Sequence, residues 1–102
     1  MNIQEIIIKS AESDHPIAAA LHHGAETKVT AIAFKSGTIL KAHTSPVTAK
    51  LLVLSGQVRY KSMDQDSILK AYAEHPIPAG IQHEVIAEAD SVCLLIQIQS
   101  NH

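Results

Sequence analysis

The stretch from Gly37 to Gly56, GTILKAHTSPVTAKLLVLSG, decides the fold of this chain. A glycine stands at each end, and apolar residues typical of β-strands lie on both sides of a polar elbow, 43–46. Glycine is typical of tight strand reversals, because it takes positive φ without strain. The pattern predicts two short strands, 38–42 and 47–54, joined by the elbow. A second passage, 78–83 (PAGIQH), has similar turn chemistry.

The rest of the chain continues this rhythm of short apolar runs separated by turns. Further strands are predicted at 3–8, 26–34, 57–61, 67–72, 84–87 and 91–99. Residues 16–23 (PIAAALHH) fit either one helical turn or a short strand, and 74–80 is typical of a turn throughout. About eight to ten strands without a long helix indicate one all-β domain over 1–102, a sandwich or a barrel.

Composition narrows the functional classes. The chain has 102 residues, a net charge of −2 and 46% hydrophobic residues, so it can bury one core. Its 8 basic and 10 acidic residues form no run of either sign, so we expect no nucleic-acid partner. The N-terminus shows no signal peptide or membrane helix, so we expect no membrane partner and a cytoplasmic location. Cys93, the single cysteine, is expected to be a buried hydrophobe in a reducing compartment.

The stretch 37–56 resembles the first motif of the cupins, which are small jelly-roll barrels. That motif has a glycine, five residues, a histidine, one residue, a second histidine, three or four residues, a glutamate, six residues and a glycine. The residues that match are Gly37, His43 and Gly56. Ser45 replaces the second histidine, and the glutamate position falls on Ala49 or, if one residue is dropped, on Lys50.

Residues of the second cupin motif lie between about 72 and 87. Its proline, second glycine and histidine are matched by Pro78, Gly80 and His83. Tyr72 stands where the first glycine is expected, and Ala87 where the asparagine is expected. The resemblance spans about 26–99 and implies a cupin-type double-stranded β-helix, a jelly-roll barrel made of a single domain.

The resemblance implies a metal site whose ligand set is incomplete. Typical cupins hold a divalent ion with three histidines and a glutamate, and only His43 and His83 carry over. Two imidazoles form a weak shell for Fe, Mn, Zn or Ni, because catalytic metal sites normally keep three protein ligands. A third ligand could come from His22, His23 or His75, which spacing does not place. The alternative is that His43 and His83 are neutral pocket residues, bonded to each other or to water.

The other histidines have simpler readings. His22 and His23 are adjacent, so on a strand at most one of them points inward. His75 precedes a proline and is expected in a surface turn.

The pocket itself is predicted to be mainly apolar. Its expected lining is Ile39, Leu52, Leu54, Ile77 and Ile96.

Three functions are consistent with these residues, and the sequence does not decide whether the chain is an enzyme. We favour a protein that binds a small molecule in the barrel, because the ligand positions are substituted while the scaffold glycines remain. The alternative is a metal-dependent cupin dioxygenase or isomerase, with the metal acting as a Lewis acid. The third is a structural or regulatory partner. In each case we expect a homodimer, to which the apolar run 6–8 could contribute by extending a neighbour's sheet.

Overall fold

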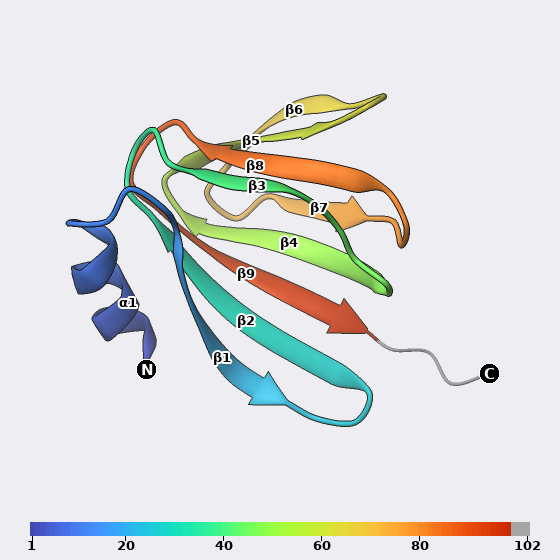
Figure 1. Cartoon of the computed structure of the whole chain (residues 1–102), viewed down its shortest axis with the longest axis horizontal. Helices are drawn as coiled ribbons and strands as arrows, with labels where there is room; N and C mark the ends of the chain where they lie inside the picture. The colour runs from blue at the N-terminus through green and yellow to red at the C-terminus, as the bar shows by residue number, and fades with distance from the viewer. Residues whose placement is uncertain (99–102) are drawn as a thin grey trace.

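Two antiparallel sheets face each other in the computed structural model, which describes residues 1–98 apart from the side chains of 42 and 43 (Figure 1). The strands are β1 Ile17–His23, β2 Thr27–Phe34, β3 Ile39–Thr44, β4 Thr48–Ser55, β5 Gln57–Ser62, β6 Asp66–Lys70, β7 Glu74–Ile77, β8 Gln82–Ala87 and β9 Ser91–Ile98. One sheet has the order β1-β2-β9-β4-β7 and the other the order β3-β8-β5-β6. The predicted all-β jelly roll is confirmed, and the ambiguous segment 16–23 forms a strand.

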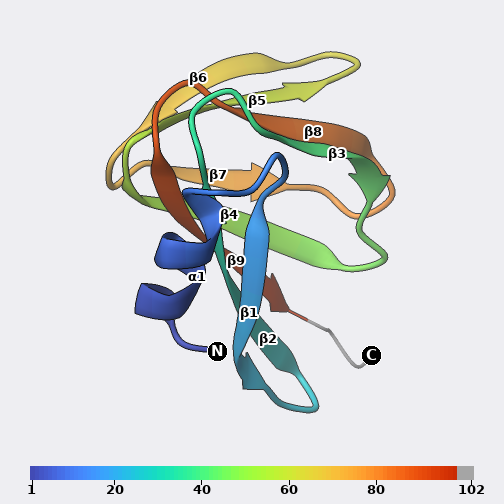
Figure 2. The ribbon, with the colours of Figure 1, turned by 60° about the vertical axis from the view of Figure 1, so that its left-hand side comes forward.

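The N-terminal run 3–8 forms a helix, so the predicted strand there is wrong. Helix α1, Ile3–Ser10, starts with a capping box, in which Asn2 Oδ1 accepts from Glu5 N at 2.9 Å and Glu5 Oε1 accepts from Asn2 N at 3.3 Å. Helix α1 lies beside β1 and β2 (Figure 2), and its Ile6 is fully buried in the core that it forms with residues of these strands. The cap and this burial outweigh the β-propensity of the isoleucines. The homodimer stays a prediction, but without the proposed strand contact.

Helix α1, the helix of the described residues, is not long and apolar enough to cross a membrane.

Helix α1 covers a small second core on the outer side of the five-stranded sheet. That core contains Ile6, Ala19, Ala31 and Ala33. Strand β2 therefore has no polar face at its C-terminal end, because its alternate residues enter two different cores.

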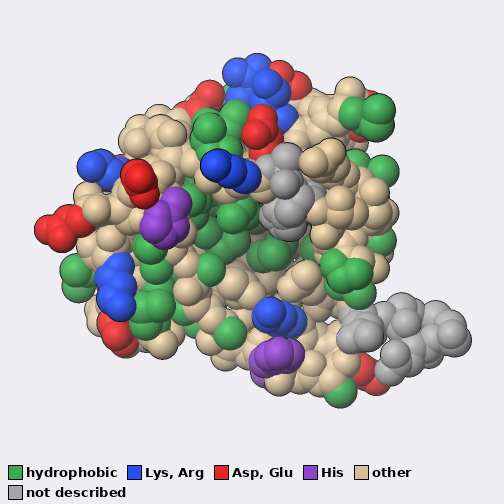
Figure 3. Space-filling model, viewed as in Figure 1, with side chains coloured by type: hydrophobic (Ala, Val, Ile, Leu, Met, Phe, Trp, Pro, Cys, Tyr) green, Lys and Arg blue, Asp and Glu red, His purple; other side chains and the backbone are tan. Residues whose placement is uncertain are grey.

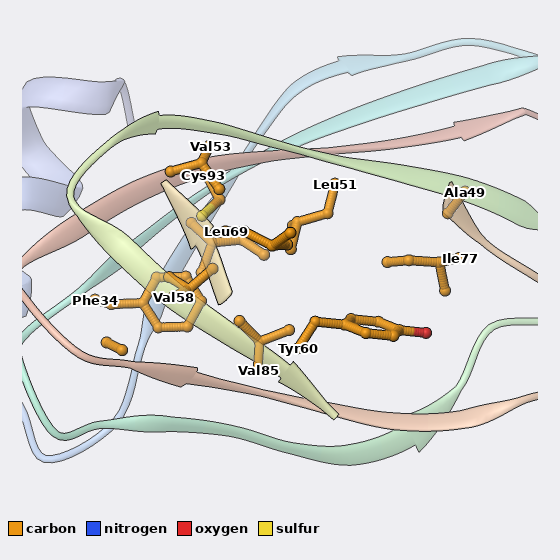
Figure 4. Packing of buried hydrophobic residues seen from close by; sticks show 12 residues of the cluster. Phe34, Ala49, Leu51, Val53, Val58, Tyr60, Leu69, Ile77, Val85 and Cys93 are labelled. Carbon is orange, nitrogen blue, oxygen red and sulfur yellow. The ribbon is translucent and has the colours of Figure 1, made fainter. Parts of the chain in front are cut away.

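The main core lies between the two sheets (Figure 4). Its members are Ile32, Phe34, Ala49, Leu51, Val53, Val58, Tyr60, Leu69, Ile77, Val85, Ala87 and Cys93. Cys93 is fully buried, as predicted, and burial raises the pKa of its thiol to about 12. The thiol is therefore protonated at neutral pH and packs as a hydrophobe.

Of the five residues predicted to line the pocket, only Ile77 faces the space between the sheets, where it is part of the core. In β4 the core-facing residues are Leu51 and Val53, whereas Leu52 and Leu54 occupy the alternate positions. A phase error of one residue moves every side chain of a strand to the opposite face. The predictions for Ile39 and Ile96 are wrong for the same reason. Ile39 is 41% exposed, and Ile96 belongs to the alternate set from Leu95, which packs on the core.

Strand β7 occupies a segment that was predicted to be a turn. The prediction rested on the turn-forming composition of 74–80, in which Pro76 cannot donate a hydrogen bond to a neighbouring strand. Strand β7 is an edge strand that pairs only with β4, and proline is tolerated there because one side of the strand needs no partner. The predicted last strand, 91–99, ends at Ile98 in the structure, and residue 99 lies outside the described range.

The turn glycines have the conformation predicted for them. Gly37, Gly56 and Gly80 have φ of 88°, 84° and 79°. Among the described residues Tyr72 is the only non-glycine with positive φ, at 71°, and it stands where the second cupin motif has glycine. Its side chain is 83% exposed, so the strained backbone is not compensated by burial of the ring.

Replacing Tyr72 with glycine is expected to stabilise the protein. Glycine adopts the left-handed conformation without strain, but it also increases the conformational entropy of the unfolded chain. The gain from the relieved strain should exceed this entropic cost and raise the free energy of unfolding by about 0.5–1 kcal/mol. Urea unfolding measures this gain. Tyr72→Ala is the matched control, because alanine keeps the Cβ and hence the strain. An equal gain in both variants would show that the ring, and not the backbone, is unfavourable.

Candidate functional site

A β-bulge in β3 aligns the two histidines of the cupin motifs. Leu40 pairs with Val85, and His43 pairs with His83, so three steps along β3 correspond to two steps along β8. The extra residue places the backbone of His43 directly opposite His83 despite the odd spacing from Leu40. The side chain of His43 lies outside the described part of the structure. The two motif loops also touch, since Gly80 N donates to the carbonyl oxygen of Ser45 at 2.9 Å.

His83 is a polar residue on the core face of β8. It is 3% exposed, and it alternates with the core residues Val85 and Ala87. Its Nδ1 lies 3.2 Å from the carbonyl oxygen of Ile81. Because a carbonyl only accepts hydrogen bonds, Nδ1 carries the proton, and in the neutral ring Nε2 is the acceptor nitrogen.

Tyr60 lies beside His83 and connects it to a second histidine. The rings of Tyr60 and His83 stack with centroids 5.6 Å apart, and the ring of His75 lies 4.3 Å from that of Tyr60. In Figure 4 the phenol oxygen of Tyr60 points away from Phe34, toward the side of the core where Ile77 lies. The three rings form a cluster that joins β7 of one sheet to β5 and β8 of the other.

The predicted surface-turn position of His75 is wrong. His75 lies in β7 opposite the core residue Leu51 and is half-buried. Its Nε2 is 3.0 Å from Gln65 Oε1, near the tip of the β5–β6 hairpin. Burial lowers the pKa of His75 below the ordinary value of 6.5. The neutral ring is therefore the form that packs on Tyr60 at pH 7.

The lowered pKa of His75 predicts a loss of stability in mild acid. The unfolded chain takes up a proton at about pH 6.5, and the folded chain does so only at lower pH. Between these two values the unfolded state binds more protons, so the free energy of unfolding falls as the pH falls. Urea unfolding at pH 7 and 5 measures the slope. His75→Gln should flatten it, and an unchanged slope in His75→Gln would contradict the prediction.

A row of polar residues continues the site onto the other sheet. His23 pairs with Lys28, Lys28 with Gln97, and Gln97 with the core residue Ala49, so the row faces the interior. His23, Lys28 and Gln97 line an open cavity of about 450 Å³ that is closed on another side by Pro46 and Val47. Of the adjacent histidines, only His23 lines it. In Figure 3 hydrophobic side chains lie at the bottom of the opening between the sheets, with basic, acidic and histidine side chains around it.

A second open cavity of about 450 Å³ lies beside His83 and the β5–β6 hairpin. Its lining is Lys61, Ser62, Met63, Gln82, His83 and Glu84. The residues that line the two cavities come from the end of the barrel where β9 ends and β8 begins, and Figure 1 shows these two strand ends on the same side of the molecule. We call this end, defined by His23, Lys28, Tyr60, His75, His83 and Gln97, the open end of the barrel.

The described residues do not fit the ligand shell of a typical cupin metal site. The hydroxyl of Ser45 donates to the carbonyl oxygen of Val47 at 2.6 Å, and Ala49 belongs to the core. Lys50, the other residue considered for the glutamate position, pairs with Glu74 at 3.1 Å. Within residues 1–98, leaving out the side chains of 42 and 43, no three His, Cys, Asp or Glu residues gather closely enough to hold a metal ion.

Sequence reasoning missed Tyr60, Lys28 and Gln97. For Lys28 a signal was present, because it alternates with Thr30, Ile32 and Phe34 and so shares the face of two large apolar residues. Gln97 follows Cys93 and Leu95 at the same spacing of two. The position of Tyr60 between two histidines depends on packing across the sheets, which local sequence does not reveal.

Comparison with known proteins gives matches among solved structures. No family model and no curated protein matches the chain. A Klebsiella pneumoniae protein with a double-stranded β-helix domain matches with TM-score 0.82 and 16% identity, over 99% of this chain and 90% of that chain. A cupin superfamily protein from Desulfitobacterium hafniense gives 0.81 and 18%, over 88% and 83%. An RmlC-like cupin from Desulfovibrio desulfuricans gives 0.79 and 20%, over 86% of each chain. The chain therefore shares the double-stranded β-helix fold of these cupin structures.

Proposed function

We propose that this protein binds a small organic molecule in the open end of its barrel. One observation carries the proposal. Polar side chains occupy inward-facing positions at this end, whereas the rest of the inner face is apolar. Folding alone gains nothing from an imidazole or an ammonium group at such positions, since partial burial of polar groups is costly. The residues that line the two cavities are mainly polar, contrary to the predicted apolar pocket, and convergent polar groups in a concave site are what orient a bound small molecule.

The ring cluster supplies two kinds of contact. The imidazole of His83 offers a polar contact for a ligand, and the hydrogen bond from its Nδ1 to the carbonyl oxygen of Ile81 holds the ring in place. Tyr60 fixes the plane of the His83 ring by stacking, and His75 supports Tyr60 from the other sheet. A ligand would therefore meet a preorganised imidazole, which lowers the entropy cost of binding.

A fragment screen by ligand-observed NMR tests this proposal. Neutral and charged fragments should include binders whose signals broaden with the wild-type protein, and binding should weaken about tenfold in His83→Ala because a hydrogen bond and a packed ring are lost. His15→Ala is the matched control, since the side chain of His15 is 70% exposed and lies before β1. If no fragment binds, or if His83→Ala retains the wild-type affinities, the proposal fails.

A metal-dependent dioxygenase or isomerase is the second candidate. It is favoured by the hydrogen bond between His83 and Ile81, because a carbonyl that fixes one ring nitrogen commonly orients the other toward a metal. The register with His43 also supports it. Elemental analysis after reconstitution with Fe²⁺, Mn²⁺, Zn²⁺ or Ni²⁺ is the test. Stoichiometric metal that is lost in His83→Ala would favour this candidate, and only trace metal would remove it.

A further inference from the structure

We propose that the ligand of the open end is a carboxylate, and that Lys28 and Gln97 bind its carboxylate group. The inference rests on the proposed function, to which it adds the chemical class of the ligand. It concerns the cavity lined by His23, Lys28 and Gln97, whereas His83 lines the other cavity at this end.

The orientation of Lys28 follows from the alternation along β2. Ile32 and Phe34 belong to the core between the sheets, and Lys28 is separated from them by an even number of residues. Across the sheet it pairs with Gln97, which in turn pairs with the core residue Ala49. Both donors therefore occupy the inner face, next to each other on neighbouring strands, where cross-strand side chains lie about 5 Å apart.

The charge of Lys28 has no counter-ion in the described structure. The ion pairs there are Asp14–His15, Lys50–Glu74 and Arg59–Asp66. Lys28 is half-buried, so its side chain loses part of its contact with water. No ion pair with an anion compensates for this cost in the described structure. A carboxylate offers two acceptor oxygens, one for the ammonium group and one for the side-chain N–H of Gln97.

Glu26 limits the charge that the cavity accepts. It is exposed and lines the same cavity, so one carboxylate already faces the space beside Lys28. A ligand with a single carboxylate and a neutral remainder suits this arrangement, because a second acidic group would be repelled by Glu26. Pro46 and Val47 offer an apolar wall for that remainder, and the volume of about 450 Å³ is typical of small-molecule sites.

Benzoate and benzamide are the probes, because they have the same shape and differ in charge. Isothermal titration at constant ionic strength should show benzoate binding at least about tenfold more tightly than benzamide, as expected for a charge-assisted contact. Lys28→Gln should remove that preference. Glu26→Gln should strengthen benzoate binding by removing the repulsion. Lys70→Gln is the control, since Lys70 is an exposed lysine of β6 outside this cavity.

Equal affinity for the two probes, or an unchanged preference in Lys28→Gln, would overturn the carboxylate assignment. If either result were accompanied by fragment binding that depends on His83, the proposed function would still hold. Absence of benzoate binding at millimolar concentration would also overturn the assignment. If the fragment screen were empty as well, both the inference and the proposed function would fail.

Discussion

Replacing Gly56 with alanine is expected to lower the free energy of unfolding by about 4 kcal/mol or more, which would be among the most damaging single substitutions. A Cβ at Gly56 would lie 2.8 Å from Ser91 Cα and closer still to Ser91 Oγ and the carbonyl oxygen of Asp90. These atoms cannot easily move, because Ser91 Oγ accepts from Gln57 N at 3.0 Å and donates to Ala89 O at 2.7 Å. The new methyl group would break this buried network in addition to straining the backbone.

Gly37→Ala is the matched control for this substitution. Gly37 has nearly the same φ, 88° against 84°, but no described atom lies within 4 Å of a Cβ built there. Its cost should therefore be the conformational term alone, about 1–2 kcal/mol. Urea unfolding of both variants separates the steric cost from the backbone cost. Equal losses in the two variants would contradict the close approach of β9 to the turn at Gly56.

Replacing Tyr60 with alanine is expected to cost about 3–5 kcal/mol, the usual range for a large aromatic side chain removed from a core. Tyr60 is 1% exposed and lies between the rings of His75 and His83. Its loss leaves a cavity at the centre of the ring cluster, so both histidines lose the surface that fixes their orientation. The variant should therefore lose fragment binding as well as stability.

Two further tyrosine variants make this prediction specific. Tyr72→Ala, at a position that is 83% exposed, should cost well under 1 kcal/mol. Tyr60→Phe keeps the ring and should keep most of the stability and the stacking on His83. Thermal unfolding gives the stabilities, and the NMR signals of the histidine rings report their environment. Unchanged ring signals in Tyr60→Ala would show that the three rings do not act as one cluster.

The turns can be predicted from the sequence better than which face of each strand is buried. Gly37, Gly56 and Gly80 were predictable because positive φ is a local requirement. The phase of β4 was not, since Leu51, Leu52, Val53 and Leu54 are all apolar and show no alternation. The helix at 3–10 was missed because its signal is the cap between Asn2 and Glu5 and not the hydrophobic pattern.

The candidate site was predictable in part. The motif spacing correctly brought the backbones of His43 and His83 together, although their alignment depends on a bulge that the sequence does not reveal. The partners of His83 could not be predicted, because Tyr60 and His75 reach it from two other strands. His75 was misplaced for a local reason, namely the proline that follows it. Contacts between strands far apart in the chain depend on register, which is fixed only when the sheets assemble.

Protein-observed NMR with the fragments found in the screen tests most directly whether the open end of the barrel is a ligand site. We predict that their shift changes will concentrate on the backbone amides of Lys28, His83 and Gln97 and on the ring nitrogens of His75 and His83, and will saturate together. Residues at the opposite end, such as Gly37 and Ser91, should not change. Shift changes centred on that opposite end or under α1, with the histidine rings unaffected, would contradict a binding site at the open end.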